Sequence, residues 1–382
     1  MPKNIVTRLD RNLARRLREA RRESGLSTRA VASSIPRRLA VSHTTIANYE
    51  NGITVPPIDV LAALANLYKR PLNWFLENRE TLGDFRYRNL RSRVPLSEQR
   101  RFEATAGKWA DAYLNLDKFL DSHPPRKPHL VESLCEVSPE KLALEVRQSV
   151  LNLDDNEPVQ NMIDVLESSS AWALEVKADF SVDGAAARHG DEFIVVINPT
   201  VANERIRMNL AHELAHLLYF KHNQELSWGD QEIEKKAYLF ATTFLLPPSQ
   251  LKEAFAGKSF LKLIQYKERF GLSLIAMVYL AEKQRIINTA AARWLWSEIA
   301  KRGWRQKEPG YVWRDRAITF ETMLEMAIHS KRLSWSDAER VTGVREDELK
   351  QRLAEVVSAT SPPPEEGGPD TIKFTDANKV RE

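Results

Sequence analysis

The stretch Asn209-Leu210-Ala211-His212-Glu213-Leu214-Ala215-His216-Leu217-Leu218 decides how the chain around it must fold. Histidines four residues apart lie on one face of a helix, so His212 and His216 can hold one metal ion. A hydrolytic zinc site takes three protein ligands and leaves one position open for water. Glu213 can accept a proton from that water. The alternative is a pair of surface histidines on an amphipathic helix.

A third ligand is expected from the acidic helix predicted beyond the motif. Glu234 precedes Ala237 and Ala241 by three and seven positions, so it shares their inward face. Glu232 points elsewhere and is expected to be solvated. His222 is the competing third ligand, although it lies where the first helix should end. The predicted site therefore consists of Zn²⁺, the ligands His212, His216 and Glu234, and the base Glu213.

Charge is unevenly distributed along the 382 residues. Residues 1–100 hold 19 Lys and Arg against 9 Asp and Glu, whereas the rest of the chain has a net charge of −6. A basic N-terminal part indicates a polyanionic partner, although a solvated charged face is the alternative. One cysteine excludes a disulfide framework and fits a reducing cytoplasm. No apolar run approaches the about 20 residues that a membrane helix needs, so no membrane association is expected.

Residues 9–77 read as five short helices, which is typical of a helix-turn-helix domain. Ser42 can cap the third helix, and Ile46 and Tyr49 would point into the core. The stretch Ser42-His43-Thr44-Thr45-Ile46-Ala47-Asn48-Tyr49-Glu50-Asn51-Gly52 resembles the recognition helix of the XRE family. The resemblance implies a double-stranded DNA operator as partner. It also implies that His43, Thr44 and Asn48 face base edges and that Ser42 lies near phosphate.

The segment between the second and third helices is longer than the usual tight turn and carries Pro36. Arg37 and Arg38 in this insertion could contact phosphate. A module that has lost DNA binding and only mediates partner contacts is the alternative. DNA readers of this type usually bind paired half-sites, so a homodimer is the default expectation.

The remaining chain is predicted to be mainly α with a small β-sheet, an α+β arrangement. Residues 85–101 are basic and expected to be loop-like, either touching nucleic acid or docking on a neighbouring domain. Strands are predicted at 171–176 and 193–197, and His189 is expected in a solvated turn. The predicted domains are a helix-turn-helix domain at 1–80, a basic linker and long helix at 81–128, a zincin-type metallopeptidase domain at 129–290, a small helical region at 291–358 and a disordered tail at 359–382.

The motifs spread over about 143–309 resemble the ImmA/IrrE family of metallopeptidases. These are Glu204-Arg-x-Arg207, Ala211-His212-Glu213-Leu214-Ala215-His216, Glu234-x-x-Ala237-x-x-Phe240-Ala241 and Phe244-Leu245-Leu246-Pro247, with Phe270-Gly271-Leu272-Ser273 and Glu308-Pro309 further on. Ala215 stands where the family usually has glycine, Met208-Asn209 replaces a Phe-Thr pair, and Phe220 stands where histidine is frequent. These departures leave the group that stabilises the oxyanion unassigned, with Tyr219, His222 and Tyr238 as candidates.

The resemblance implies a zinc-dependent endopeptidase that acts on a repressor or antitoxin protein. We therefore expect a cytoplasmic DNA-binding regulator that carries such a peptidase. The alternative is a non-catalytic one-component transcription factor or antitoxin whose peptidase-like domain senses a ligand or partner. Glu213 favours the enzyme, because a sensor has no need of a base beside the metal.

Overall fold

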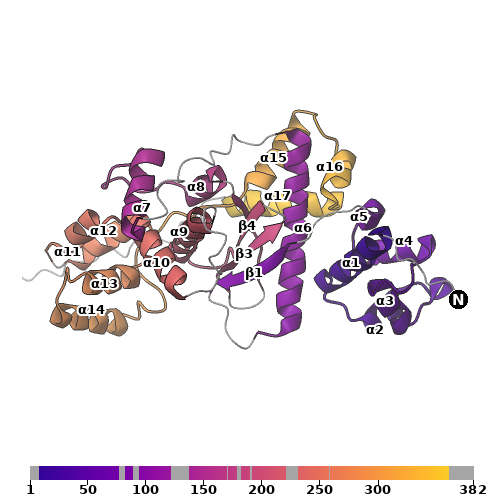
Figure 1. The fold of residues 1–382 in the computed structure, drawn as a ribbon, viewed down its shortest axis with the longest axis horizontal. Coiled ribbons are helices and arrows are strands. Elements are labelled where there is room, and N and C mark those ends of the chain that lie inside the picture. The colour runs from indigo at the N-terminus through magenta and orange to yellow at the C-terminus, as the bar shows by residue number, and fades with distance from the viewer. Residues whose placement is uncertain are drawn as a thin grey trace, which may run out of the picture.

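The computed structural model describes residues 8–76, 82–88, 94–121, 137–169, 171–178, 182–189, 192–220, 231–257 and 259–360. The molecule is elongated, with a small helical domain at one end and a larger body built around a sheet (Figure 1). A second group of helices covers the far end of the body. The fold is therefore mainly helical with one small sheet, as the sequence predicted.

Five helices form the N-terminal domain. They are α1 (Arg8–Glu23), α2 (Thr28–Ser34), α3 (His43–Glu50), α4 (Ile58–Leu67) and α5 (Leu72–Leu76). The side chains of Leu17, Val31, Ile46, Leu64 and Phe75 meet in one buried cluster between them. The insertion before α3 forms a 3-10 helix at Arg37–Leu39, so the extra residues add one turn and leave the helical core intact.

The sheet of the body has four strands in the order β1-β3-β4-β2. Their bounds are β1 (Gly83–Arg88), β2 (Ala171–Glu175), β3 (Gly184–His189) and β4 (Glu192–Ile197). β3 pairs antiparallel with β1 and β4, and β4 pairs parallel with β2. A Cβ atom on Gly184 would lie 2.4 Å from the carbonyl oxygen of Val196, so only glycine permits the close approach of β3 to β4 there.

Side chains on the two faces of the sheet enter two different cores. Ala173, Ala186 and Val195 belong to one buried cluster with the helices of the body. Trp172 and Ile194 belong to the other, which is built on α6 (Leu96–Leu120) and the C-terminal helices. Because successive side chains of a strand point to opposite faces, the sheet is the middle of three layers.

Helices on the first face form most of the body. They are α7 (Pro139–Glu145), α8 (Met162–Ser168), α9 (Asn203–Phe220), α10 (Gln231–Leu245), α11 (Pro248–Phe255), α12 (Phe260–Phe270), α13 (Leu274–Lys283) and α14 (Thr289–Lys301), with a π-helical turn at Val146–Val150. On the second face, α15 (Thr319–His329), α16 (Trp335–Thr342) and α17 (Glu346–Thr360) pack with α6. Phe320 lies against Trp109 of α6, with ring centroids 5.8 Å apart.

Two expectations about local structure were wrong. The segment 85–101, expected to be loop-like, begins instead with β1, which adds to the sheet. His189 is the last residue of β3 rather than part of a solvated turn, and its Nε2 lies 3.0 Å from Asp111 Oδ1. Both errors have one cause: each segment acquires its structure from a partner far away in the sequence.

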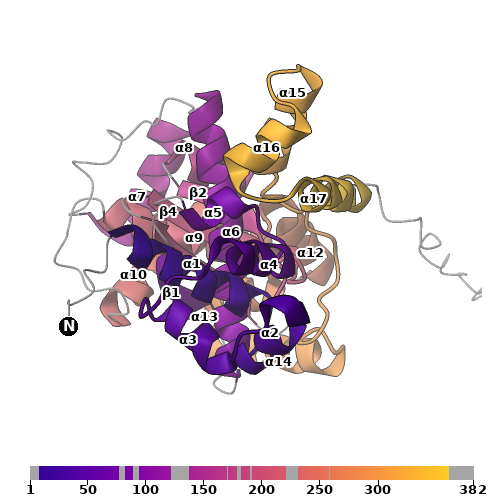
Figure 2. The same ribbon diagram turned by 90° about the vertical axis from the view of Figure 1, so that its right-hand side faces the viewer.

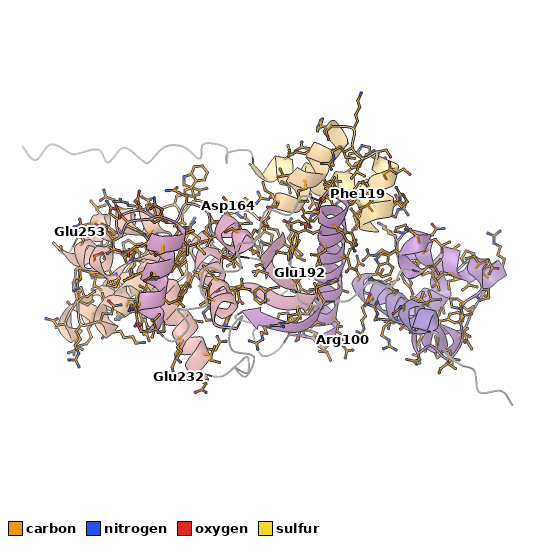
Figure 3. All side chains as sticks on the ribbon, turned by 45° about the horizontal axis from the view of Figure 1, so that its top comes forward. Arg100, Phe119, Asp164, Glu192, Glu232 and Glu253 are labelled. Carbon is orange, nitrogen blue, oxygen red and sulfur yellow. The ribbon has the colours of Figure 1, made fainter. Side chains whose placement is uncertain are left out.

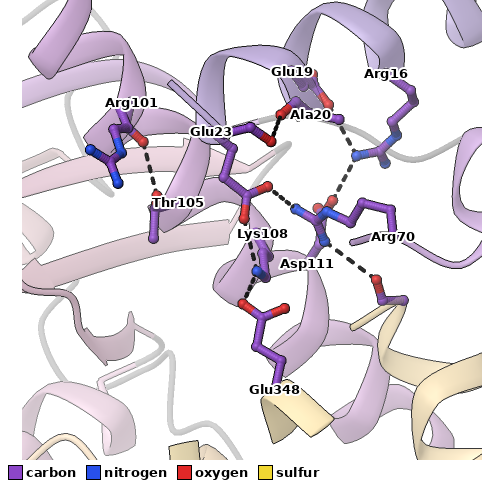
Figure 4. Close-up of polar contacts among 12 residues, drawn as sticks. Arg16, Glu19, Ala20, Glu23, Arg70, Arg101, Thr105, Lys108, Asp111 and Glu348 are labelled. Carbon is purple, nitrogen blue, oxygen red and sulfur yellow. Dashed lines mark hydrogen bonds and ion pairs between the residues drawn. The ribbon is translucent and has the colours of Figure 1, made fainter. Parts of the chain in front are cut away.

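The helix-turn-helix domain docks on α6 through α1, by ion pairs that are largely buried (Figure 4). Arg16 Nη1 donates to Asp111 Oδ2 at 2.9 Å, and both side chains are almost fully buried. Glu23 accepts from Lys108 Nζ of α6 at 2.8 Å and from Arg70 Nη2 at 2.6 Å. Charged groups removed from water stabilise an interface only when each finds a partner, so these contacts define one docked arrangement.

The C-terminal helices contribute to the same docking surface. Lys108 also pairs with Glu348 of α17, and Arg70 Nη1 donates to the carbonyl oxygen of Gly343. The guanidinium groups of Arg16 and Arg70 lie 4.5 Å and 4.4 Å from the ring centroid of the buried Trp74. Figures 1 and 2 show α3 on the outer side of the N-terminal domain, away from α6. Docking through α1 therefore leaves α3 away from the interface with α6.

Candidate metal centre and nucleic-acid interface

Helix α9 carries the two histidines on the side that meets α10. His212 and His216 are 7% and 1% exposed. Leu210 and Leu214, on a different side of the helix, are buried in the body's core. The apolar residues at these positions hold α9 against the core of the body, and so determine the direction of both imidazoles.

Three donor atoms converge at this site. His212 Nε2 lies 2.9 Å from His216 Nε2 and 3.1 Å from Glu234 Oε2. His216 Nε2 lies 3.3 Å from Glu234 Oε1. Two ligands at zinc-bonding distance and the tetrahedral angle would be about 3.3 Å apart. Two imidazole nitrogens and one carboxylate are also the donor set of hydrolytic zinc sites, so the residues present fit a zinc ion.

Helix α10 presents Glu234 to the histidines. Ala237 and Ala241, one and two turns further along, are completely buried, as expected for an inward face. Glu234 itself is 37% exposed, so the carboxylate stands at the rim of the site. Glu232 lies at the solvent end of α10, turned away from the body (Figure 3). His222 and the side chain of Tyr219 lie outside the described residues.

The sequence assigned Glu213 as the base beside the ligands and left Tyr238 as one of three candidates for the oxyanion stabiliser. Glu213 follows His212 on α9 and is only 4% exposed. Tyr238 lies one turn after Glu234 on α10, and its ring packs edge-on against that of Tyr279. Burial, and then the neighbouring Tyr279, raise the pKa of Tyr238 to about 12. Its hydroxyl is therefore protonated near neutral pH and able to donate a hydrogen bond.

A buried ionic cluster supports α9 from its N-terminal half. Lys267 of α12 lies 3.1 Å from Glu204 and 3.2 Å from Glu308. Arg207 pairs with Asp315 at 2.7 Å. The motif residues 204, 207 and 308, distant in the sequence, thus meet around one helix. We conclude that they position α9 and do not touch the candidate metal site themselves.

Gly271 is required by the same cluster. Its φ is +71°, and an added Cβ would lie 2.2 Å from Arg207 Nε. Glycine therefore ends α12 in a left-handed conformation and leaves room for the Arg207 side chain. The Phe-Gly-Leu-Ser motif thus has a packing role beside α9.

The predicted DNA-contacting residues surround the N-terminal end of α3. Ser42 Oγ accepts a hydrogen bond from the backbone N–H of Thr45, which caps the helix. His43 and Thr44 are exposed, whereas Asn48 is half-buried. The exposed arginines of the preceding 3-10 helix, Arg37 and Arg38, lie just before this cap in the chain.

Comparison with known families agrees with this division of the chain. Residues 12–73 match the family model described as a helix-turn-helix domain. Residues 163–281 match the model of a peptidase family described as an IrrE N-terminal-like domain. Among curated proteins, none matches the chain. The chain thus joins an XRE-like helix-turn-helix domain to an ImmA/IrrE-like peptidase-family domain. This architecture supports a DNA-binding regulator that carries a peptidase-like domain.

Within the described part of the chain, no helix is long and apolar enough to cross a membrane. The sequence interpretation missed the residues that join the two domains, among them Arg16 and Asp111. Their charges could not have been distinguished from solvated surface charges, because the two partners are 95 positions apart.

Proposed function

We propose that this chain is a DNA-binding regulator whose second domain is a zinc-dependent endopeptidase acting on a repressor or antitoxin protein. The observation that carries the proposal is the convergence of His212, His216 and Glu234 on one point. A helix-turn-helix domain in the same chain supports a substrate that belongs to the same regulatory circuit. An exposed loop of such a partner is the expected cleavage site, because cleavage requires a segment that can leave its fold.

The residues around the site have distinct roles in this proposal. His212, His216 and Glu234 would hold a zinc ion, which would supply the Lewis acidity needed to activate a water molecule and to polarise a peptide carbonyl. Glu213 accepts the proton of the attacking water and returns it to the leaving amine. Tyr238 is our candidate for the hydrogen-bond donor to the oxygen that gains charge. Its protonated hydroxyl and its place one turn from Glu234 support this assignment.

The DNA-binding half acts through α3. We assign phosphate contacts to Ser42, Arg37 and Arg38, and base contacts to His43, Thr44 and Asn48. A homodimer would bring two such helices to paired half-sites. Footprinting on the DNA upstream of the chain's own gene tests this half. We expect a specific footprint at physiological salt. Its absence would mean that the positive charge of the N-terminal domain is a solvated surface and does not serve specific DNA binding.

Zinc content per chain tests the metal site. The parent protein should hold one zinc ion, and Glu234→Ala should hold markedly less. Glu232→Ala is the matched control, because it removes an acidic side chain from the same helix at an exposed position. Zinc retained in Glu234→Ala would point to His222 as the third ligand. No zinc in a folded parent would favour the non-catalytic transcription factor.

The Glu213→Gln variant separates binding from chemistry. Its amide cannot accept the water proton, so cleavage should fall by at least a hundredfold while zinc content stays at the parental level. Full cleavage by this variant would contradict the role of Glu213.

A further inference from the structure

Strand β1 belongs to neither of the family-matched segments. It lies between residues 73 and 163, yet it completes the sheet of the peptidase-like domain by pairing with β3. Without β1, β3 would be the edge of that sheet. A free edge presents unpaired N–H and C=O groups, to which an extended polypeptide can add as a further strand. The linker between the two domains therefore supplies a strand, β1, that covers an edge of β3 able to bind another polypeptide.

The covered edge borders the layer that contains the candidate metal site. Ala186 of β3 is buried in the same cluster as Leu210 and Leu214 of the metal-site helix α9. Arg86 of β1 is the pairing partner of Ala186, and paired residues project on the same face of a sheet. A strand in the position of β1 thus directs alternate side chains to the α9 side. In Figure 1, β1 reaches from beside α6 toward α10.

Strand β1 is less buried and less regularly paired than the strands behind it. Phe85, Arg86 and Tyr87 are all half-buried, whereas β4 is buried from Phe193 to Ile197. The pairing with β3 is continuous only over Arg86–Arg88, because the register shifts between Gly83 and Arg86. A half-buried peripheral strand of this kind opens at a lower free energy than the core of the sheet.

Tyr87 attaches β1 to α6 through its side chain. Its hydroxyl lies 2.8 Å from Glu103 Oε1, and its ring centroid lies 6.1 Å from that of Phe102. Both partners belong to α6, so this attachment joins the strand to the helix on the other face of the sheet. It can be weakened by removing one hydroxyl, in Tyr87→Phe.

The elements on either side of β1 remain in place when the strand leaves. Six residues separate it from α5 and seven from α6. Those two elements are held by the docked domain, through Arg16 with Asp111 and Glu23 with Lys108. Displacement of β1 is therefore a local event, since none of these ion pairs includes a residue of β1.

We propose that β1 is an exchangeable strand that covers the substrate-binding edge of β3, and that an extended segment of the protein substrate pairs antiparallel with β3 in its place. The proposal rests on the proposed peptidase function and specifies how its substrate is admitted. It names the substrate class as polypeptide in extended conformation. It also makes the linker between the two domains a competitor of substrate.

A reversible crosslink between β1 and β3 tests the proposal. The variant Arg86→Cys/Ala186→Cys, made with Cys135→Ser to remove the native thiol, places two cysteines at paired positions. Antiparallel partners have Cα atoms about 4.5–5.5 Å apart, within the range of a disulfide. The same zinc-loaded full-length protein is then compared in its oxidised and reduced forms, with Cys135→Ser alone as the control for the redox treatment.

Casein, a loosely folded protein, serves as the cleavage probe. The oxidised form should cleave it at least tenfold more slowly than the reduced form, and reductant should restore the rate. Equal rates in the two forms would overturn the proposal, because β1 would then not have to move. The absence of cleavage in every form, with zinc bound, would contradict the proposed peptidase function.

Hydrogen exchange tests whether β1 opens more readily than the core of the sheet, without relying on enzyme activity. In the reduced form, amides of 83–88 should exchange at least a hundredfold faster than those of 192–197, and oxidation should slow them. Amides of 83–88 protected as strongly as 192–197 would show a permanent strand and overturn the proposal. If the double-cysteine variant does not fold, Tyr87→Phe replaces it. Loss of the hydroxyl should accelerate both the exchange of 83–88 and the cleavage of casein, and unchanged values would count against the proposal.

Discussion

The pair formed by Arg16 and Asp111 allows a quantitative test of how the DNA-binding domain is held. Both side chains are at most 5% exposed, and their charged atoms are 2.9 Å apart. In Asp111→Leu, the buried Arg16 guanidinium loses its buried partner and keeps the contact of Nη1 with the less buried Glu19 Oε2 at 3.2 Å, and His189 loses the Asp111 carboxylate as well. Removing one member of a buried pair costs about 3–5 kcal/mol. At about 1.4 kcal/mol per tenfold change, this corresponds to roughly two to four powers of ten in the equilibrium for undocking.

The matched control removes both charges. In Arg16→Met/Asp111→Leu, two apolar side chains of similar length replace the pair, and such replacements are often neutral or stabilising. Both variants lose the contact between Asp111 and His189, so the double variant should dock more tightly than the single variant and approach the parent. The difference between the single and double variants isolates the cost of an unpaired charge from the loss of packing.

Hydrogen exchange of α1 measures undocking, because this helix is covered by α6 only in the docked state. In Asp111→Leu, the most protected amides of α1 should exchange faster by the factor given above, whereas those of α10 should not change. Unchanged exchange of α1 in Asp111→Leu would refute the reasoning. A double variant that exchanges as fast as the single variant would refute it as well, since burial of an unpaired charge would not be the cause.

Two further predictions concern a helix cap and a buried carboxyl group. Ser42→Ala removes the acceptor for the N–H of Thr45. It should lower the free energy of unfolding of the helix-turn-helix domain by about 1 kcal/mol. Urea titrations of the full chain measure this loss, and an unchanged midpoint would contradict the capping role. Burial raises the pKa of Glu167, which accepts hydrogen bonds from Tyr113 and Thr319. A raised folded-state pKa adds stability below the unfolded value that is lost as pH rises through the folded value. In urea unfolding, the free energy of unfolding of Glu167→Gln relative to that of the parent should therefore be more favourable at pH 7 than at pH 4. A difference between the two proteins that does not depend on pH would contradict the raised pKa.

The metal-site prediction depended on short-range geometry. His212 and His216 are one helical turn apart, so their shared direction follows from the period of the helix. Glu234 was placed with Ala237 and Ala241 by the same period on a second helix. That the two helices meet with three donor atoms at 2.9–3.3 Å required their packing, which the apolar positions imply but do not specify.

Strand β3 shows why part of the sheet could not be read from the sequence. Its residues Gly184–His189 include three alanines and no β-branched side chain. Alanine has low intrinsic preference for strands, and this segment is extended because β4 and β1 pair with it on both sides. The stronger strand β4 was predicted because its five apolar residues need burial on both faces.

The sequence by itself determined the class of each domain, the helix that carries the histidines and the candidate set of ligands, because these depend on local periodicity and on residue chemistry. Only the tertiary structure decided that the linker supplies β1 and that Asp111 joins Arg16 to His189. Both depend on which distant segments become neighbours. The local sequence of a linker is the same whether its charged and aromatic side chains face water or contact another segment. Only the packing of the whole chain decides which of these two environments they have.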